Sequence, residues 1–67
     1  MMYKQIEAQL VSIGMTKREM AQQLGIGYNT LLLKLKGDSK FTLDEALAIK
    51  KLIQSEESIE RLFERSA

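Results

Sequence analysis

The chain has 67 residues, of which 45% are hydrophobic and 28% charged, and its ten basic and nine acidic side chains leave a net charge of +1. It contains no cysteine, histidine or proline, a composition that excludes disulfides, thiolate metal sites and histidine-based catalysis and favours a helical chain. No apolar run reaches the length of about 20 residues that a membrane-spanning helix needs, and the amphipathic N-terminus lacks the pattern of a signal peptide. We therefore expect one all-α domain over residues 1–67, located in the cytoplasm and without a metal or cofactor.

The first predicted helix covers residues 3–13, and Gly14 follows it as a stop. Its large apolar residues are spaced three or four apart, which places them on one helix face. These residues are Tyr3, Ile6, Leu10 and Ile13. We expect this face to pack against the core, with the tyrosine as a partly buried anchor at the helix start.

A tight turn is predicted to join two short helices in the middle of the chain. Thr16 and Glu19 have the spacing of a capping box, in which each side chain accepts a hydrogen bond from the other residue's backbone N–H. Gly25 can take the left-handed conformation that ends the first of these helices. The second is predicted from near Tyr28 to Lys36, before another glycine. The connection is about three residues long, as a helix-turn-helix requires.

A second capping box, Thr42 and Glu45, starts a fourth predicted helix over about residues 43–54. Its apolar residues are expected to face the core: Leu43, Ala46, Leu47, Ile49 and Ile53. A last short helix is predicted to start near Ser58. Its apolar residues at positions i, i+3 and i+4 are Ile59, Leu62 and Phe63. They are expected either to contact a second copy of the chain or to close the core.

The two central helices resemble the helix-turn-helix of phage repressors and Cro proteins, the lambda-repressor-like DNA-binding domains. The residues that match the family pattern are Thr16, the polar Lys17, Glu19, Met20, Ala21, Leu24, Gly25, Ile26, Thr30, Leu31 and Gly37. The resemblance implies a compact five-helix bundle that acts as a transcriptional regulator, such as a small repressor of a bacterium or its phage. It also implies binding to a double-stranded DNA operator, as a weak homodimer and without a small-molecule effector.

In this family the second helix of the pair places its N-terminal turn in the major groove. The resemblance therefore implies base contacts from Tyr28, Asn29 and Leu33. Asn29 is the most informative, because its amide can donate and accept together at an adenine edge. Alternatively, Asn29 bonds nearby backbone and Tyr28 packs against Leu32. Candidate phosphate contacts, which would position the protein without specifying sequence, are Lys17, Thr30, Lys36 and Lys40.

Three departures from the family pattern lie in or beside the second helix of the pair. Gly27 replaces a frequent serine and offers no side-chain oxygen to the helix start. Lys34 replaces a frequent apolar core residue, so we expect the core contact to move to Leu35. Leu33 replaces a residue that is usually polar. We expect it to be exposed, where it contacts either thymine methyl groups or a partner protein.

The charges are unevenly distributed along the chain. Residues 1–40 hold six basic and three acidic side chains, a net charge of +3, whereas residues 41–67 hold four basic and six acidic ones, a net charge of −2. A polyanion should therefore dock on the first part, which contains the helix-turn-helix.

The alternative function is a helix-turn-helix fold that binds a protein, as an anti-repressor does. An enzyme is not expected, because the acidic residues occupy helix starts and polar faces.

Overall fold

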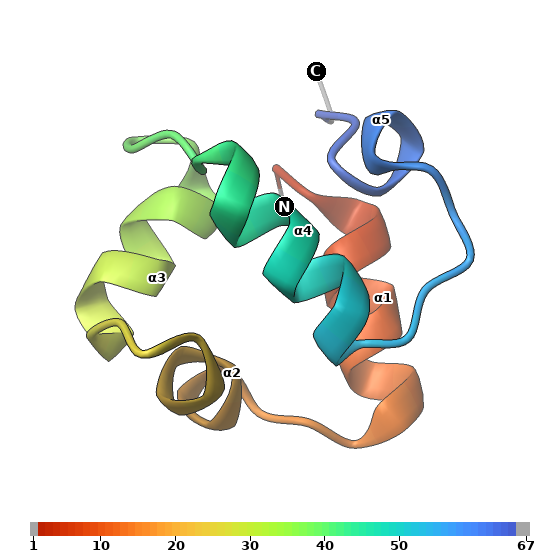
Figure 1. The fold of residues 1–67 in the computed structure, drawn as a ribbon. Helices are drawn as coiled ribbons and strands as arrows, with labels where there is room; N and C mark the ends of the chain where they lie inside the picture. Colours follow the sequence, from red (N-terminus) through yellow and green to blue (C-terminus); the bar gives the residue numbers. More distant parts are fainter. Residues whose placement is uncertain (1, 66–67) are drawn as a thin grey trace.

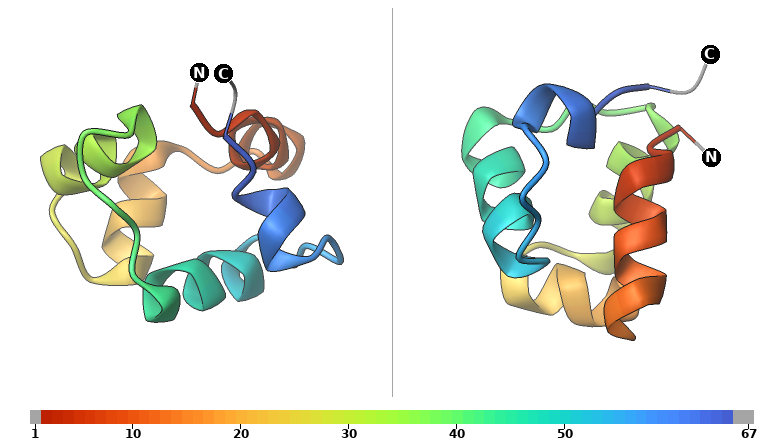
Figure 2. Two further views of the ribbon diagram at one scale, coloured as in Figure 1. Left: turned by 90° about the horizontal axis from the view of Figure 1, so that it is seen from above. Right: turned by 90° about the vertical axis from the view of Figure 1, so that its right-hand side faces the viewer.

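The computed structural model describes residues 2–65, which contain five helices and no strand. They are α1 (Lys4–Ile13), α2 (Lys17–Leu24), α3 (Tyr28–Lys36), α4 (Leu43–Leu52) and α5 (Ile59–Leu62). The helices form a ring around one core, in which α2 contacts α3 and α4, while α5 contacts α4 and α1 (Figure 1, Figure 2). The predicted all-α, five-helix architecture is confirmed. No helix of this described part is long and apolar enough to cross a membrane.

Local signals place the helix ends where they were predicted. The backbone N–H of Glu19 donates to Thr16 Oγ1 over 3.1 Å, and Glu19 Oε1 accepts from the Thr16 N–H over 2.9 Å. Thr42 and Glu45 form the same two bonds at the start of α4. The first three helices each end at a glycine in the left-handed conformation, with φ between 70° and 88°. Two limits differ from the prediction, because α1 begins at Lys4, one residue later than predicted, and α4 ends at Leu52, before the predicted residue 54.

Each helix contributes a large apolar side chain to the core. The residues with no exposed surface include Ile6 of α1, Met20 of α2, Leu31 of α3, Ile49 of α4 and Leu62 of α5. Full burial of a side chain of this size contributes about 1.5 to 3 kcal/mol relative to leaving it in water. The five helices therefore depend on one another for their stability, and α3 in particular is held from one side by this core.

Three aromatic rings close one end of the core. Tyr3, Phe41 and Phe63 pack edge to face, with ring centroids 5.2 to 5.8 Å apart. This geometry is favoured because the positive edge of one ring meets the negative face of the next. Tyr3 is only 6% exposed, so the anchor predicted to be partly buried is in fact buried. It joins the start of α1 to the residues that flank α4 and α5.

Three apolar residues predicted to face the core are exposed instead. Leu43 and Leu47 of α4 are 68% and 49% exposed, and Ile13 at the end of α1 is 44% exposed. α2 and α5 both pack against α4, and the α4 residues Ala46 and Ile49 are buried. Because successive helix residues are about 100° apart, burial of that face leaves the other arc of α4 in solvent. The prediction that Leu43 and Leu47 face the core is therefore wrong, and the prediction for Ile13, the last residue of α1, is wrong as well.

Candidate nucleic-acid interface

The predicted three-residue turn, residues 25–27, joins α2 to α3. Gly25 has a φ of 73°, and the N–H of Ile26 donates back to the carbonyl of Ala21 over 3.1 Å. A turn of this kind satisfies the last carbonyls of α2 and sets the direction in which the chain leaves it. α2 then packs against α3. The angle of α3 is therefore held by the turn, by α2 and by the core.

α3 has one buried and one exposed side. Leu31 and Leu35 point into the core and are at most 2% exposed. The exposed residues, which we call the outer face of α3, are Asn29, Thr30, Leu33 and Lys36. Leu33 is 46% exposed, which confirms the prediction that this leucine faces solvent. The outer face thus presents an amide, a hydroxyl, an apolar group and a cation along about two helix turns.

Asn29 lies in the first turn of α3. Its amide takes part in none of the side-chain hydrogen bonds within residues 2–65. The alternative interpretation, in which Asn29 bonds nearby backbone, is therefore not what this structure contains. An exposed amide at the start of a helix has both its donor and its acceptor available to a ligand.

Arg18, which the sequence analysis does not single out, lies beside the start of α3. Its guanidinium carbon is 4.1 Å from the centroid of the Tyr28 ring, well within the range of a cation–π contact. The ring thus holds an exposed cation next to the first turn of α3. No local pattern predicts this contact, because the two residues lie on different helices and meet only through the angle between α2 and α3.

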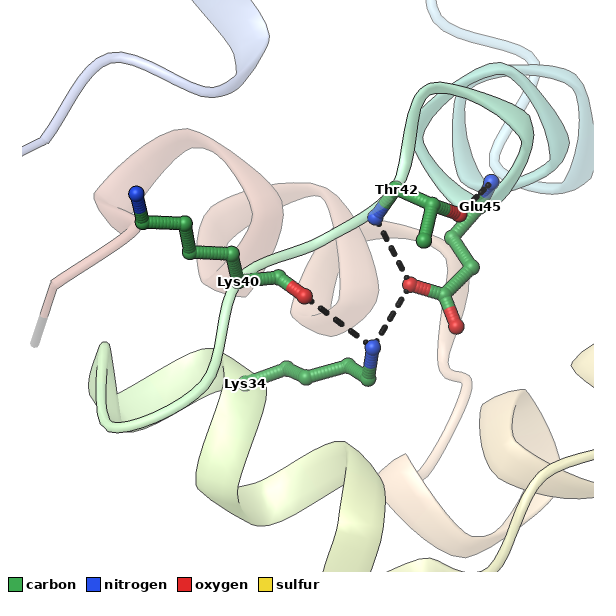
Figure 3. Close-up of polar contacts among 4 residues, drawn as sticks. All are labelled: Lys34, Lys40, Thr42 and Glu45. Carbon is green, nitrogen blue, oxygen red and sulfur yellow. Dashed lines mark hydrogen bonds and ion pairs between the residues drawn. The ribbon is translucent and has the colours of Figure 1, made fainter.

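The lysines predicted to contact phosphates differ in whether a nearby carboxylate of the chain already neutralises their charge. Lys17 Nζ lies 3.1 Å from Glu7 Oε1, an ionic contact between two largely covered side chains. Lys36 Nζ lies 3.7 Å from Asp38 Oδ2, but both of these side chains are more than 60% exposed, so the contact is weak. Lys40 takes part in no ion pair of the described chain, and its ammonium points away from the other residues drawn in Figure 3.

A buried lysine ties the end of α3 to the start of α4 (Figure 3). The Lys34 ammonium donates to the carbonyl of Lys40 over 3.0 Å and to Glu45 Oε1 over 2.8 Å. The same carboxylate oxygen accepts the backbone N–H of Thr42 over 2.9 Å. The core contact was predicted to move from position 34 to Leu35, but both residues are buried. The lysine stem packs at the edge of the core while its ammonium reaches these polar partners.

The hydrogen bond from Lys34 holds the pKa of Glu45 below its ordinary value of 4.5, with help from the bonds to Thr42. A carboxylate with a lower pKa in the folded state stabilises the fold at high pH, and this contribution is lost as the pH falls through the folded pKa. We therefore expect stability to fall below about pH 4.5. Glu45→Gln should weaken that dependence and lower stability at pH 7 by about 1 to 3 kcal/mol, measured by urea unfolding.

The matched control for Glu45→Gln is Glu56→Gln. Glu56 is exposed and belongs to none of the ion pairs among residues 2–65. We expect its substitution to leave both the stability at pH 7 and the acid dependence close to those of the original chain. Equal effects of the two substitutions would contradict the role assigned to Glu45.

No protein-family model, curated protein or solved structure matches the chain. Its function must therefore be inferred from its own residues and their geometry. The outer face of α3 is the first surface to consider, because a rigid, core-anchored helix presents an uncommitted amide there. Arg18 and Lys36 add cations at either end of the same helix.

The last helix, by contrast, closes the core. Leu62 is fully buried in the core. Phe63 is partly buried, packs against the core and belongs to the aromatic cluster. Ile59 is half-buried. Figure 2 shows α5 and the segment before it on the side of the ring away from α3. The acidic side chains of that segment therefore lie away from the outer face of α3.

Proposed function

We propose that this chain is a sequence-specific DNA-binding protein that reads the major groove with α3, as a transcriptional regulator does. The observation that supports this proposal most is the outer face of α3, an exposed helix side with base-reading and phosphate-binding residue types. An α-helix fits the width of the B-DNA major groove, and its N-terminal turn is the part that reaches the base edges. The buried side of α3 would supply the rigidity that such reading requires.

Two side chains one helical turn apart would read the bases. Asn29, in the first turn, has a side-chain amide that can both donate and accept a hydrogen bond. An adenine offers the matching groups, which are the acceptor N7 and the donor N6. Leu33 follows at i+4 and is 46% exposed, so it can make apolar contact with a thymine methyl group. An A·T pair followed by a further thymine in the groove is the simplest sequence that both residues would favour.

Cations around the outer face would bind the phosphates. Arg18, Lys36 and Lys40 are exposed, and they flank α3 at its start, at its end and beyond it. Lys17 is the weakest of the predicted contacts, because Glu7 already balances its charge. Thr30 would add a neutral hydroxyl contact. Phosphate contacts of this kind provide affinity and orientation without specifying sequence.

The exposed Leu33 also supports a second candidate function, which is binding to a partner protein through the same face. A large apolar side chain at the centre of an exposed helix is a feature of protein interfaces as well as of groove readers. The two functions differ in their salt dependence. Binding to phosphates releases counterions and weakens steeply with salt, whereas a contact centred on leucine responds little.

Selection from a pool of random duplex DNA, run at low and at high salt, tests the proposal. We expect an enriched motif that contains an adenine. With three phosphate-binding cations per chain, affinity should fall roughly 40-fold between about 50 and 200 mM salt. Failure to enrich any motif at low salt would contradict the DNA-binding proposal and favour the protein partner.

A further inference from the structure

α4 carries an exposed stripe that the core does not use. The exposed residues of α4 all lie on one arc of the helix, and we call them the α4 stripe: Leu43, Asp44, Leu47, Ala48 and Lys51. At about 100° per residue they cover an arc of about 140°. Leu43 and Leu47 are 68% and 49% exposed, so the two large exposed apolar side chains of α4 lie one turn apart on this stripe.

The α4 stripe carries opposite charges at equal distances from its middle. Asp44 lies before Leu47, and Lys51 lies the same number of residues after Ala48. Neither charge takes part in an ion pair or a side-chain hydrogen bond within the part of the chain that the structure describes. The adjacent Lys50, by contrast, donates to the carbonyl of Ser55 over 3.0 Å. The two stripe charges are therefore available to a partner.

This arrangement is complementary to itself. When two identical helices pack antiparallel across a twofold axis, each residue on one side of the axis faces a residue equally far from it on the other. With the axis between positions 47 and 48, Asp44 of one copy faces Lys51 of the other, twice over. The same register sets the large Leu47 against the small Ala48, so that the helices can approach closely.

We propose that the α4 stripe binds a second copy of this chain, with the two α4 helices antiparallel and Leu47 at the centre of the contact. The interface is small, because a helix of ten residues is about 15 Å long. A stable dimer usually buries about 800 Å² on each partner, a large share of the 4584 Å² surface of this domain. The dimer should therefore be weak, with a dissociation constant on the order of 0.1 to 1 mM.

Sedimentation equilibrium without DNA, from about 10 µM to about 2 mM protein, tests this proposal. The average mass of the original chain should rise from 7.6 kDa towards twice that value. Leu47→Glu should keep it at the monomer mass. Because Leu47 is exposed, this variant should still fold, which far-UV circular dichroism checks. Val11→Glu is the matched control, since Val11 is an apolar residue that is 80% exposed on another helix, and it should dimerise as the original chain does.

Charge reversal tests the antiparallel register. Asp44→Lys and Lys51→Asp, each alone, place like charges opposite one another and should weaken the dimer about tenfold. Mixing the two variants should restore it, because each then supplies the charge that the other lacks. A monomer at the highest concentration, a dimer unaffected by Leu47→Glu, or no recovery on mixing would overturn the proposal. Each of these results is independent of DNA binding, because no DNA is present.

Discussion

Leu31→Ala is expected to unfold the domain at room temperature. Leu31 has no exposed surface and belongs to the hydrophobic core, and removing a buried leucine side chain costs about 2 to 5 kcal/mol. A single core of this size supplies a net stability of only about 3 to 5 kcal/mol. The variant should therefore lose most of its helical circular dichroism signal and its cooperative urea transition.

Leu33→Ala is the control for this prediction, because it makes the same change two positions further along the same helix. Leu33 is 46% exposed, so its truncation leaves no buried cavity, and the stability should change by about 0.5 kcal/mol or less. The pair of variants separates the effect of burial from that of helix propensity, which is nearly the same for both. Similar losses of stability in the two variants would contradict the assignment of Leu31 to the core and Leu33 to the surface.

Asn29→Ala is expected to have the largest effect on the proposed DNA binding. A bidentate contact between an asparagine amide and adenine contributes about 1 to 3 kcal/mol of discrimination, which corresponds to a factor of about 5 to 150. The variant should bind duplexes with and without the adenine almost equally. Its stability should not change, because the exposed amide makes no hydrogen bond within residues 2–65. Competition binding between matched duplexes measures the preference.

Two further variants give this experiment its controls. Gln9→Ala removes an amide that lines a groove with the segment between α4 and α5, away from the outer face of α3, and it should change neither affinity nor preference. Lys36→Ala removes a proposed phosphate contact, so it should weaken binding to all duplexes alike and reduce the salt dependence. An adenine preference that survives Asn29→Ala would contradict the assignment of this residue as a base reader.

The limits of the helices could be predicted from the sequence, because the interactions that set them span only a few residues. The bonds between Thr16 and Glu19 close over three residues, and a left-handed turn at Gly25 needs only the local freedom of glycine. The sequence predicted this helix from near Tyr28 to Lys36, and α3 spans Tyr28–Lys36. The exposure of Leu33 followed from the same local logic, since four neighbouring leucines cannot all face one side of a helix.

Only the tertiary structure determined which face of each helix is buried and which side chains meet across helices. The contact between Arg18 and Tyr28, and the reach of Lys34 to Glu45, depend on the angles between helices rather than on any spacing along the chain. The apolar residues of α4 have helical spacing on more than one side of the helix. Which arc is buried depends on where α2 and α5 pack, and this contact leaves Leu43 and Leu47 exposed. Periodicity shows that a helix is amphipathic, whereas burial depends on neighbours that are distant in sequence.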